Sequence, residues 1–266
     1  MKIPRVMTFL LIYLLILLAV FLLQRKIMYF PARFTQEQQK ELMTDLNLQP
    51  WPSANELRGI MSKTPLTDAK GTVLVFHGNA GAALHRTYYI DALQNLGYQV
   101  IIAEYPGYGV RSGTPSEAVL IKDGIATAKM ALHAFKEPLF LCGESLGTGV
   151  VAGIVASHEV SVKGLLLITP FDAMTKVAQH HYWYFLPRWL LLDKFNNVPK
   201  FRNFQGNIAV LLAEQDEVIP NRRTMALFDA ISERKQLWRF ENANHNSLPL
   251  EHWRLWWQEV MKFIDH

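Results

Sequence analysis

The stretch "LCGESLG", residues 141–147, decides the fold. Glycines at 143 and 147 lie two residues before and two after Ser145, and the apolar run "PLFLCG" (138–143) leads into the stretch. A tight turn from a strand into a helix brings backbone atoms close together at those two positions, so side chains there would clash. The helix that follows points its first N–H groups at developing negative charge. The same pattern also fits a capping serine without chemistry, so the rest of the chain must supply a base and a carboxylate.

From residue 72 onward, short apolar runs alternate with helical stretches. The runs are continuous rather than alternating in polarity, which is typical of a mostly parallel sheet covered on both faces. In such a sheet, ligands bind at the carboxyl ends of the strands. We therefore predict an α/β fold whose strands are "TVLVFH" (72–77), "YQVIIAEY" (98–105), "PLFLCG" (138–143), "VKGLLLITP" (162–170), "IAVLLAE" (208–214) and "QLWRFE" (236–241).

Two further side chains follow strands in the order that a nucleophilic serine requires. Asp216 lies in "AEQDEVIP" (213–220) after the predicted fifth strand, and His245 lies in the polar loop "FENANHNSLP" (240–249) after the sixth. Serine needs a base at neutral pH, and the base needs an acceptor that fixes its tautomer. The order Ser145, Asp216, His245 is the order of the triad in α/β-hydrolases.

The sequence leaves rivals for two of these roles. Asp172 follows the predicted fourth strand and Glu217 adjoins Asp216, so both are alternative carboxylates. His180 and His181 are alternative bases, although they precede an aromatic segment instead of following a strand.

The loop after the first predicted strand supplies the remaining part of such a site. "HGNAG" (77–81) can turn the backbone N–H of Asn79 towards the serine, and the N–H of Leu146 is the second candidate donor to an oxyanion. We expect His77 to shape this loop and not to act as a base.

Through six motifs that occur in the same order along the chain, the sequence resembles a known family, the serine aminopeptidase S33-like hydrolases. It is also similar to the membrane-anchored BEM46-like and ABHD-type α/β-hydrolases. The resemblance covers about residues 71–265 and implies a triad of Ser145, Asp216 and His245. Glu104 departs from it, because this family usually has aspartate before "YPGYG". The matching motifs are "HGNAG" (77–81), "YPGYGVRSGTPSE" (105–117), "GESLGTG" (143–149), "TPFDAM" (169–174), "AEQDEVIP" (213–220) and "NANHN" (242–246).

The N-terminal segment 6–23 contains 18 uncharged residues. As a helix it would rise about 27 Å, close to the roughly 30 Å hydrocarbon core of a bilayer. A cleaved signal peptide is the rival interpretation, but no small-x-small cleavage site follows the segment. We therefore expect a single uncleaved transmembrane anchor. Basic residues stand on both sides of it, so its orientation and the side of the membrane stay open.

Residues 24–70 are expected to form a juxtamembrane linker and an N-terminal section, in which "QPWPSANE" (49–56), with two prolines, is typical of a turn. This section lacks the β-hairpin pattern usual in the family. Residues 71–266 are expected to form the α/β-hydrolase domain. Nearly forty residues separate its fourth and fifth strands, which favours a cap over 172–205. The aromatic part of that cap, 180–195, is either one helix on the sheet or a short lid over an apolar acyl pocket.

Composition excludes several other classes of function. Five of the 27 basic residues fall in the first 33, which contain no acidic residue, and the remainder nearly equal the 23 acidic ones, so nothing suggests nucleic-acid binding. No H-E-x-x-H, cysteine pair or G-x-x-x-x-G-K-[ST] is present, so we expect no metal and no cofactor. The single Cys142 is expected to be a buried small hydrophobe.

These observations predict a membrane-anchored serine hydrolase that cleaves esters or thioesters of hydrophobic, lipid-like acyl groups. An S33-type peptidase or aminopeptidase is the second hypothesis. It would need an acidic group for the substrate amine, and Glu144 and Asp172 are the candidates. A third hypothesis is a hydrolase-fold protein that binds a ligand without turnover. The oligomeric state is not predicted.

Overall fold

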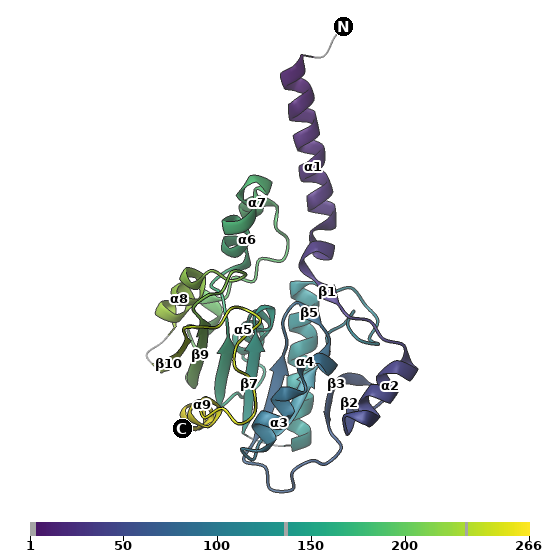
Figure 1. The fold of residues 1–266 in the computed structure, drawn as a ribbon, viewed down its shortest axis with the longest axis vertical. Coiled ribbons are helices and arrows are strands. Elements are labelled where there is room, and N and C mark those ends of the chain that lie inside the picture. The colour runs from purple at the N-terminus through teal and green to yellow at the C-terminus, as the bar shows by residue number, and fades with distance from the viewer. Residues whose placement is uncertain (1–3, 136–137, 232–233) are drawn as a thin grey trace.

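The computed structural model describes residues 4–135, 138–231 and 234–266, and it has an α/β-hydrolase fold (Figure 1), as the sequence predicts. One sheet of eight strands forms the centre. Its strands from β10 to β6 are parallel, and β3 and β2 continue it in antiparallel pairing. In spatial order they are β10 (Lys235–Phe240), β9 (Asn207–Ala213), β8 (Gly164–Ile168), β7 (Leu139–Glu144), β4 (Thr72–Phe76), β6 (Gln99–Ala103), β3 (Leu57–Ser62) and β2 (Leu48–Pro52).

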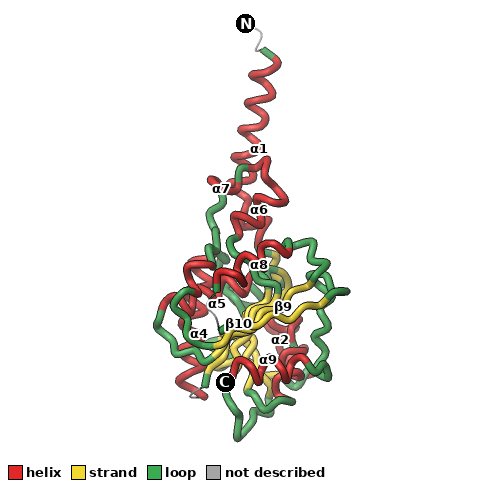
Figure 2. The backbone as a smooth tube through the Cα atoms, turned by 90° about the vertical axis from the view of Figure 1, so that its left-hand side faces the viewer, coloured by secondary structure: helices red, strands yellow, loops and turns green. Residues whose placement is uncertain are grey.

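Helices cover both faces of this sheet (Figure 2), and each face has its own apolar core. On one face pack α4 (Glu117–Phe135), α5 (Leu146–Ser157) and α8 (Asn221–Ala230). On the other face pack α3 (Tyr88–Gln94) and α9 (Trp256–Asp265), with α2 (Gln36–Asp45) beside the outer strands. Because both faces are buried, the central strands carry the continuous apolar runs seen in the sequence.

The strand β2 is the main error of the sequence interpretation. The stretch "QPWPSANE" was expected to be a turn, and its residues 53–56 do form the turn between β2 and β3, but its residues 49–52 lie in β2, which pairs antiparallel with β3. Proline cannot donate a hydrogen bond to a neighbouring strand, so it is tolerated on an edge strand, and β2 is the edge of this sheet. Within the section 24–70, the strands β2 and β3 therefore extend the central sheet.

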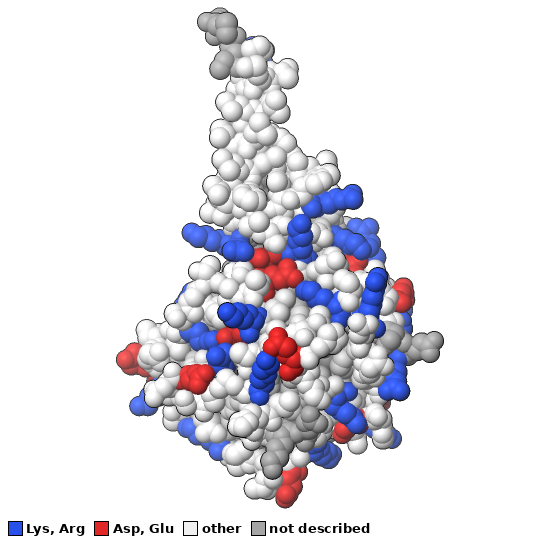
Figure 3. Space-filling view, turned by 180° about the vertical axis from the view of Figure 1, so that it is seen from behind, with Lys and Arg blue, Asp and Glu red and all other residues white. Residues whose placement is uncertain are grey.

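The helix α1 (Arg5–Met28) projects from the body of the molecule. Its C-terminal part, residues 20–28, is called the foot and the apolar part before it the shaft. The foot joins the body near β1 (Phe30–Pro31), which pairs with β5 (Ala80–Gly81). It is long and apolar enough to cross a membrane by length and composition, with a mean hydropathy of 3.1 over its most apolar 18 residues. A signal sequence would pass the same test. In Figure 3, the shaft of α1 shows no charged side chains along its middle, and Lys and Arg side chains gather around the foot.

The residues between β8 and β9 rise beside the lower part of α1 (Figures 1 and 2). They form α6 (Met174–Tyr182), the 3₁₀ helix η2 (Trp183–Phe185), α7 (Pro187–Leu190) and the 3₁₀ helix η3 (Val198–Phe201). The aromatic segment 180–195 is thus a series of short helices and turns, and not one helix packed on the sheet. A further 3₁₀ helix, η1 (Ala83–Arg86), follows β5.

Candidate active site

Ser145 occupies a strained turn between β7 and α5. Its φ of 51° is in the left-handed region that side chains rarely adopt. A Cβ at Gly147 would lie 1.9 Å from the carbonyl oxygen of Phe76, and one at Gly143 would lie 2.8 Å from the Thr148 backbone. The glycines therefore permit the close approach that turns the serine out of the strand, as the motif predicts.

The structure brings the three predicted residues together. The Nε2 atom of His245 lies 3.0 Å from Ser145 Oγ, and its Nδ1 atom lies 2.7 Å from Asp216 Oδ2. All three side chains come from loops at the carboxyl ends of parallel strands, namely β7, β9 and β10. A serine, an imidazole and a carboxylate joined in this order have the geometry that general-base activation of a hydroxyl requires.

Asp216 is held in place by its own loop. Its other oxygen, Oδ1, accepts hydrogen bonds from the N–H groups of Val218 and Ile219 at 2.8 and 2.7 Å, and the side chain is 2% exposed. The carboxylate therefore has a fixed direction towards His245. The loops after β9 and β10 are joined as well, because the N–H of Gln215 donates to the carbonyl of Ala243 at 2.9 Å.

The two predicted oxyanion donors lie at the same place. Asn79 and Leu146 both line the cavity that contains Ser145. Within the described part of the chain, neither backbone N–H donates to another group of the protein. Asn79 is fixed by its other groups: its Nδ2 donates to Met28 O at 2.8 Å, and its carbonyl accepts from Phe30 N at 3.0 Å. Among the described residues, both N–H groups are thus without a protein acceptor.

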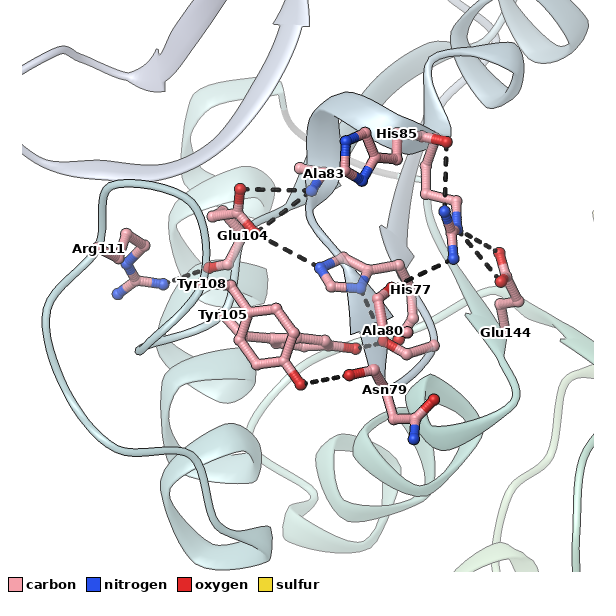
Figure 4. A network of polar contacts seen from close by, with 12 residues as sticks. His77, Asn79, Ala80, Ala83, His85, Glu104, Tyr105, Tyr108, Arg111 and Glu144 are labelled. Carbon is pink, nitrogen blue, oxygen red and sulfur yellow. Dashed lines mark hydrogen bonds and ion pairs between the residues drawn. The ribbon is translucent and has the colours of Figure 1, made fainter. Parts of the chain in front are cut away.

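A buried polar network supports this loop from behind (Figure 4). The hydroxyls of Tyr105 and Tyr108 donate to the carbonyls of His77 and Asn79, each at 2.7 Å. Glu104 is 2% exposed and accepts from the N–H of Ala83. The glutamate that departs from the family pattern therefore still holds the loop.

The ring of His77 is turned into that network. Its Nδ1 lies 2.8 Å from Gly78 O, and its Nε2 lies 3.5 Å from Glu104 Oε1. The side chain is completely buried. His77 therefore shapes the loop, as expected, and has no contact with Ser145.

Of the two rival carboxylates, Glu217 is exposed and Asp172 is engaged elsewhere. Asp172 accepts from the N–H of Ala173 at 2.9 Å and forms ion pairs with Lys176 at 2.8 Å and Arg223 at 3.2 Å. Because its oxygens are occupied on a different loop, it is not the partner of His245.

Glu144, next to the serine, is equally engaged. It forms an ion pair with Arg86 at 3.2 Å and accepts from the hydroxyls of Tyr88 at 3.2 Å and Tyr89 at 2.9 Å. Burial, with the nearby Glu144 charge as the second cause, raises the pKa of Tyr88 and Tyr89 above the usual value, so both remain protonated donors. The charge of Glu144 is thus already compensated.

The other side chains weighed from the sequence lie outside the Ser145–His245–Asp216 arrangement. His180 Nδ1 contacts Arg222, and His181 Nε2 lies 2.9 Å from Val218 O. Cys142 is fully buried, and burial raises the pKa of its thiol well above the usual value, so it is not a nucleophile. Among the described residues, no group of three or more His, Cys, Asp or Glu is placed to hold a metal ion.

Ser145 opens into a cavity of about 530 Å³. Its walls are largely apolar and come from three parts of the chain: the foot of α1, the segment from α6 to α7, and the loop after β9. The contribution of α1 was not predicted from the sequence, because even its last residue, Met28, lies 117 positions before Ser145. The one local signal was Gln24, the polar residue that directly follows the apolar run 6–23, and it lines this cavity.

Comparisons with known proteins agree with this fold. The sequence profile of the family described as serine aminopeptidase, S33, matches residues 67–199, which is half of the chain. The protein Rv2307c of Mycobacterium tuberculosis is 29% identical over 195 residues, covering 72% of this chain and 69% of that protein. Lysophosphatidylserine lipase ABHD12 of Mus musculus is 30% identical over 196 residues, covering 64% of this chain and 48% of that enzyme. The chain thus matches about half the length of the ABHD12 relatives.

Solved structures share the fold at low sequence identity. A monoacylglycerol lipase of Paleococcus ferrophilus superimposes with a TM-score of 0.55 and 17% identity, covering 76% of this chain and 94% of that one. Est1E of Butyrivibrio proteoclasticus, solved with ferulic acid, gives a TM-score of 0.57 with 13% identity, covering 74% and 88%. From its profile match, its fold and its serine turn, the chain is a hydrolytic enzyme that belongs to the serine aminopeptidase S33 family of α/β-hydrolases.

Proposed function

We propose that this enzyme hydrolyses esters or thioesters of hydrophobic acyl groups, using Ser145, His245 and Asp216 as a catalytic triad. The observation that carries the proposal is the unbroken chain of contacts from Asp216 through His245 to Ser145 at the floor of an apolar cavity. A polar reacting end and an apolar body are what such a site accommodates.

The reaction would follow the steps of acyl transfer to water. Ser145 Oγ attacks the carbonyl carbon while His245 Nε2 takes the hydroxyl proton. The N–H groups of Asn79 and Leu146 receive the oxyanion, and Asp216 stabilises the imidazolium. The proton then passes to the leaving alcohol or thiol. A water molecule, deprotonated by His245, then attacks the acyl-enzyme and releases the acid, with the proton returning to Ser145. The reaction therefore requires no cofactor.

The lining of the cavity supports a lipid-like substrate. Most of the side chains around it are aliphatic or aromatic, and the single carboxylate among the described lining residues is Glu217, which is exposed. Relatives named as lipases point in the same direction.

We also propose that α1 is a retained membrane anchor. Val20 and Phe21 form part of the cavity wall, so cleavage after the apolar segment 6–23 would remove them from the site. A signal peptide is removed from the mature protein, so its residues would not contribute to the site.

An aminopeptidase activity is less well supported. Binding a substrate ammonium group needs an uncompensated carboxylate near the scissile bond, yet Glu144 and Asp172 both face cations already. Among the lining residues that the structure describes, Glu217 is the one carboxylate left, and it is exposed.

The first test is labelling by a fluorophosphonate probe, with the full chain in detergent. Wild type should be labelled, and Ser145→Ala and His245→Ala should not, with a loss in ester turnover of about 10⁶-fold. A folded wild type that resists the probe would contradict the triad and favour a binding protein. Turnover of aminoacyl p-nitroanilides in preference to acyl esters would favour the peptidase.

A further inference from the structure

The foot of α1 presents one face to the candidate active site. Val20, Phe21, Gln24, Ile27 and Met28 line the cavity that holds Ser145. Their spacings of three and four residues place them on one side of the helix. A helix that served only as a tether would not need a face adapted to the substrate.

Specific polar contacts fix this face against the segment between β8 and β9. Gln24 is 8% exposed; its Nε2 donates to Leu190 O at 3.2 Å, and its Oε1 accepts from Leu192 N at 2.7 Å. Both ends of one buried amide are therefore used to hold α7 beside the helix. An unpaired amide would be costly to bury, so the two elements are positioned together.

Asp193 adds a second set of contacts at the same level. Its carboxylate forms an ion pair with Arg25 at 3.0 Å and accepts from the hydroxyl of Tyr29 at 3.0 Å. The Asp193 side chain is almost fully buried. These bonds lie where the apolar shaft gives way to charged residues, which is the position of a membrane interface.

The segment also extends along the apolar shaft beyond that level. The hydroxyl of Tyr13 donates to Tyr184 O at 2.7 Å. Tyr13 precedes Gln24 by eleven residues, which corresponds to about 16 Å along a helix. The tip of the segment carries large exposed side chains, with Trp183 64% and Trp189 69% exposed. Apolar residues exposed at that height would face lipid if α1 spans a bilayer.

We infer that α1 and the segment from α6 to α7 form the two walls of an acyl-binding tunnel that opens into the bilayer. The occupant is one acyl chain of a membrane lipid, which enters sideways from the leaflet and brings its ester carbonyl to Ser145. The side chains on the inner face of α1 set the length of chain that fits. This inference deepens the proposed function and rests on it.

The test is acyl-chain selectivity in two variants at the same level of α1. Val20→Trp fills the tunnel from its wall. Leu22→Trp places the same side chain on the far side of the helix, where Leu22 is 70% exposed and outside the cavity. Full-length proteins in detergent are compared by the ratio of kcat/KM for p-nitrophenyl palmitate to that for p-nitrophenyl acetate. Val20→Trp should lower this ratio about tenfold or more, and Leu22→Trp should leave it as in wild type.

Fluorophosphonate labelling in the same samples separates the two hypotheses. A wild type without labelling contradicts the proposed function itself. A labelled wild type whose ratio is altered equally by both variants, or by neither, overturns the tunnel. If Val20→Trp does not fold, Phe21→Ala is the second variant. It widens the tunnel and should raise the ratio for longer chains, whereas Leu22→Ala should not. An unchanged ratio in Phe21→Ala would likewise overturn the inference.

Discussion

The loops at the carboxyl edge of the sheet and the walls above them are built in different ways. At the edge, Ser145, Asp216 and His245 stand on loops that follow buried parallel strands, and each has a defined hydrogen-bond partner. In the walls, short helices lean on α1 through a few polar contacts, and many of their side chains are exposed. The difference suggests that the sheet fixes the chemistry, whereas the helices above it set the choice of substrate.

Among variants of the edge that keep Ser145 and His245, the largest effect should come from Asp216→Asn. This change preserves size but removes the charge that orients His245, and it should lower kcat about 10⁴-fold. Asp172→Asn is the matched control, because Asp172 also follows a strand but pairs with Lys176 and Arg223. It should affect thermal stability and leave turnover per labelled molecule close to wild type. Equal losses of turnover in both variants would contradict the assignment of the carboxylate.

A smaller effect is expected where the two regions meet. Asn79→Ala keeps the backbone N–H but removes the hydrogen bond to Met28 O at the end of α1. Misplacing a catalytic group by about 1 Å can cost about 10²-fold in rate. We therefore expect kcat to fall by up to that factor, with little change in KM, in steady-state assays on p-nitrophenyl esters.

The control for this variant is Asn55→Ala, at an exposed position between β2 and β3. It should match wild type. A change confined to KM in Asn79→Ala would mean that the contact with α1 serves binding and not the oxyanion.

The smallest effect should come from the contact between the walls. Asp193→Asn removes the ion pair with Arg25, whose side chain is 44% exposed, so the loss should be about 1 kcal/mol. That corresponds to roughly 2–4 °C in the Tm of a chain of this size. Lys26→Gln, one residue along from Arg25 and exposed, should leave the Tm unchanged. A loss of fluorophosphonate labelling in Asp193→Asn would mean that the walls also hold the triad, and the two regions would not be separable.

Several structural features could be predicted because they depend on local sequence. Strands buried on both faces are continuous apolar runs, so β4, β6, β7, β8 and β9 were recognisable. The glycines around Ser145 reflect contacts with the backbone of nearby residues, so the turn was recognisable too. Parallel strands then bring the loops that follow them to one edge, which is why Asp216 and His245 could be selected.

Other features depend on contacts between distant parts of the chain. The prolines of β2 look like a turn until the strand is known to lie at the sheet edge. Glu144 and Asp172 look like free acids until the basic residues that face them are known.

The sequence by itself determined the fold, the family, and the order of serine, aspartate and histidine, because periodicity and turn chemistry are local properties. Only the tertiary structure decided that α1 is a wall of the cavity, since the face of an apolar helix that packs against protein has the same composition as the face that meets lipid. Hydrogen bonds between Gln24 and two residues more than 160 positions away, Leu190 and Leu192, distinguish the two faces, and no local pattern contains them.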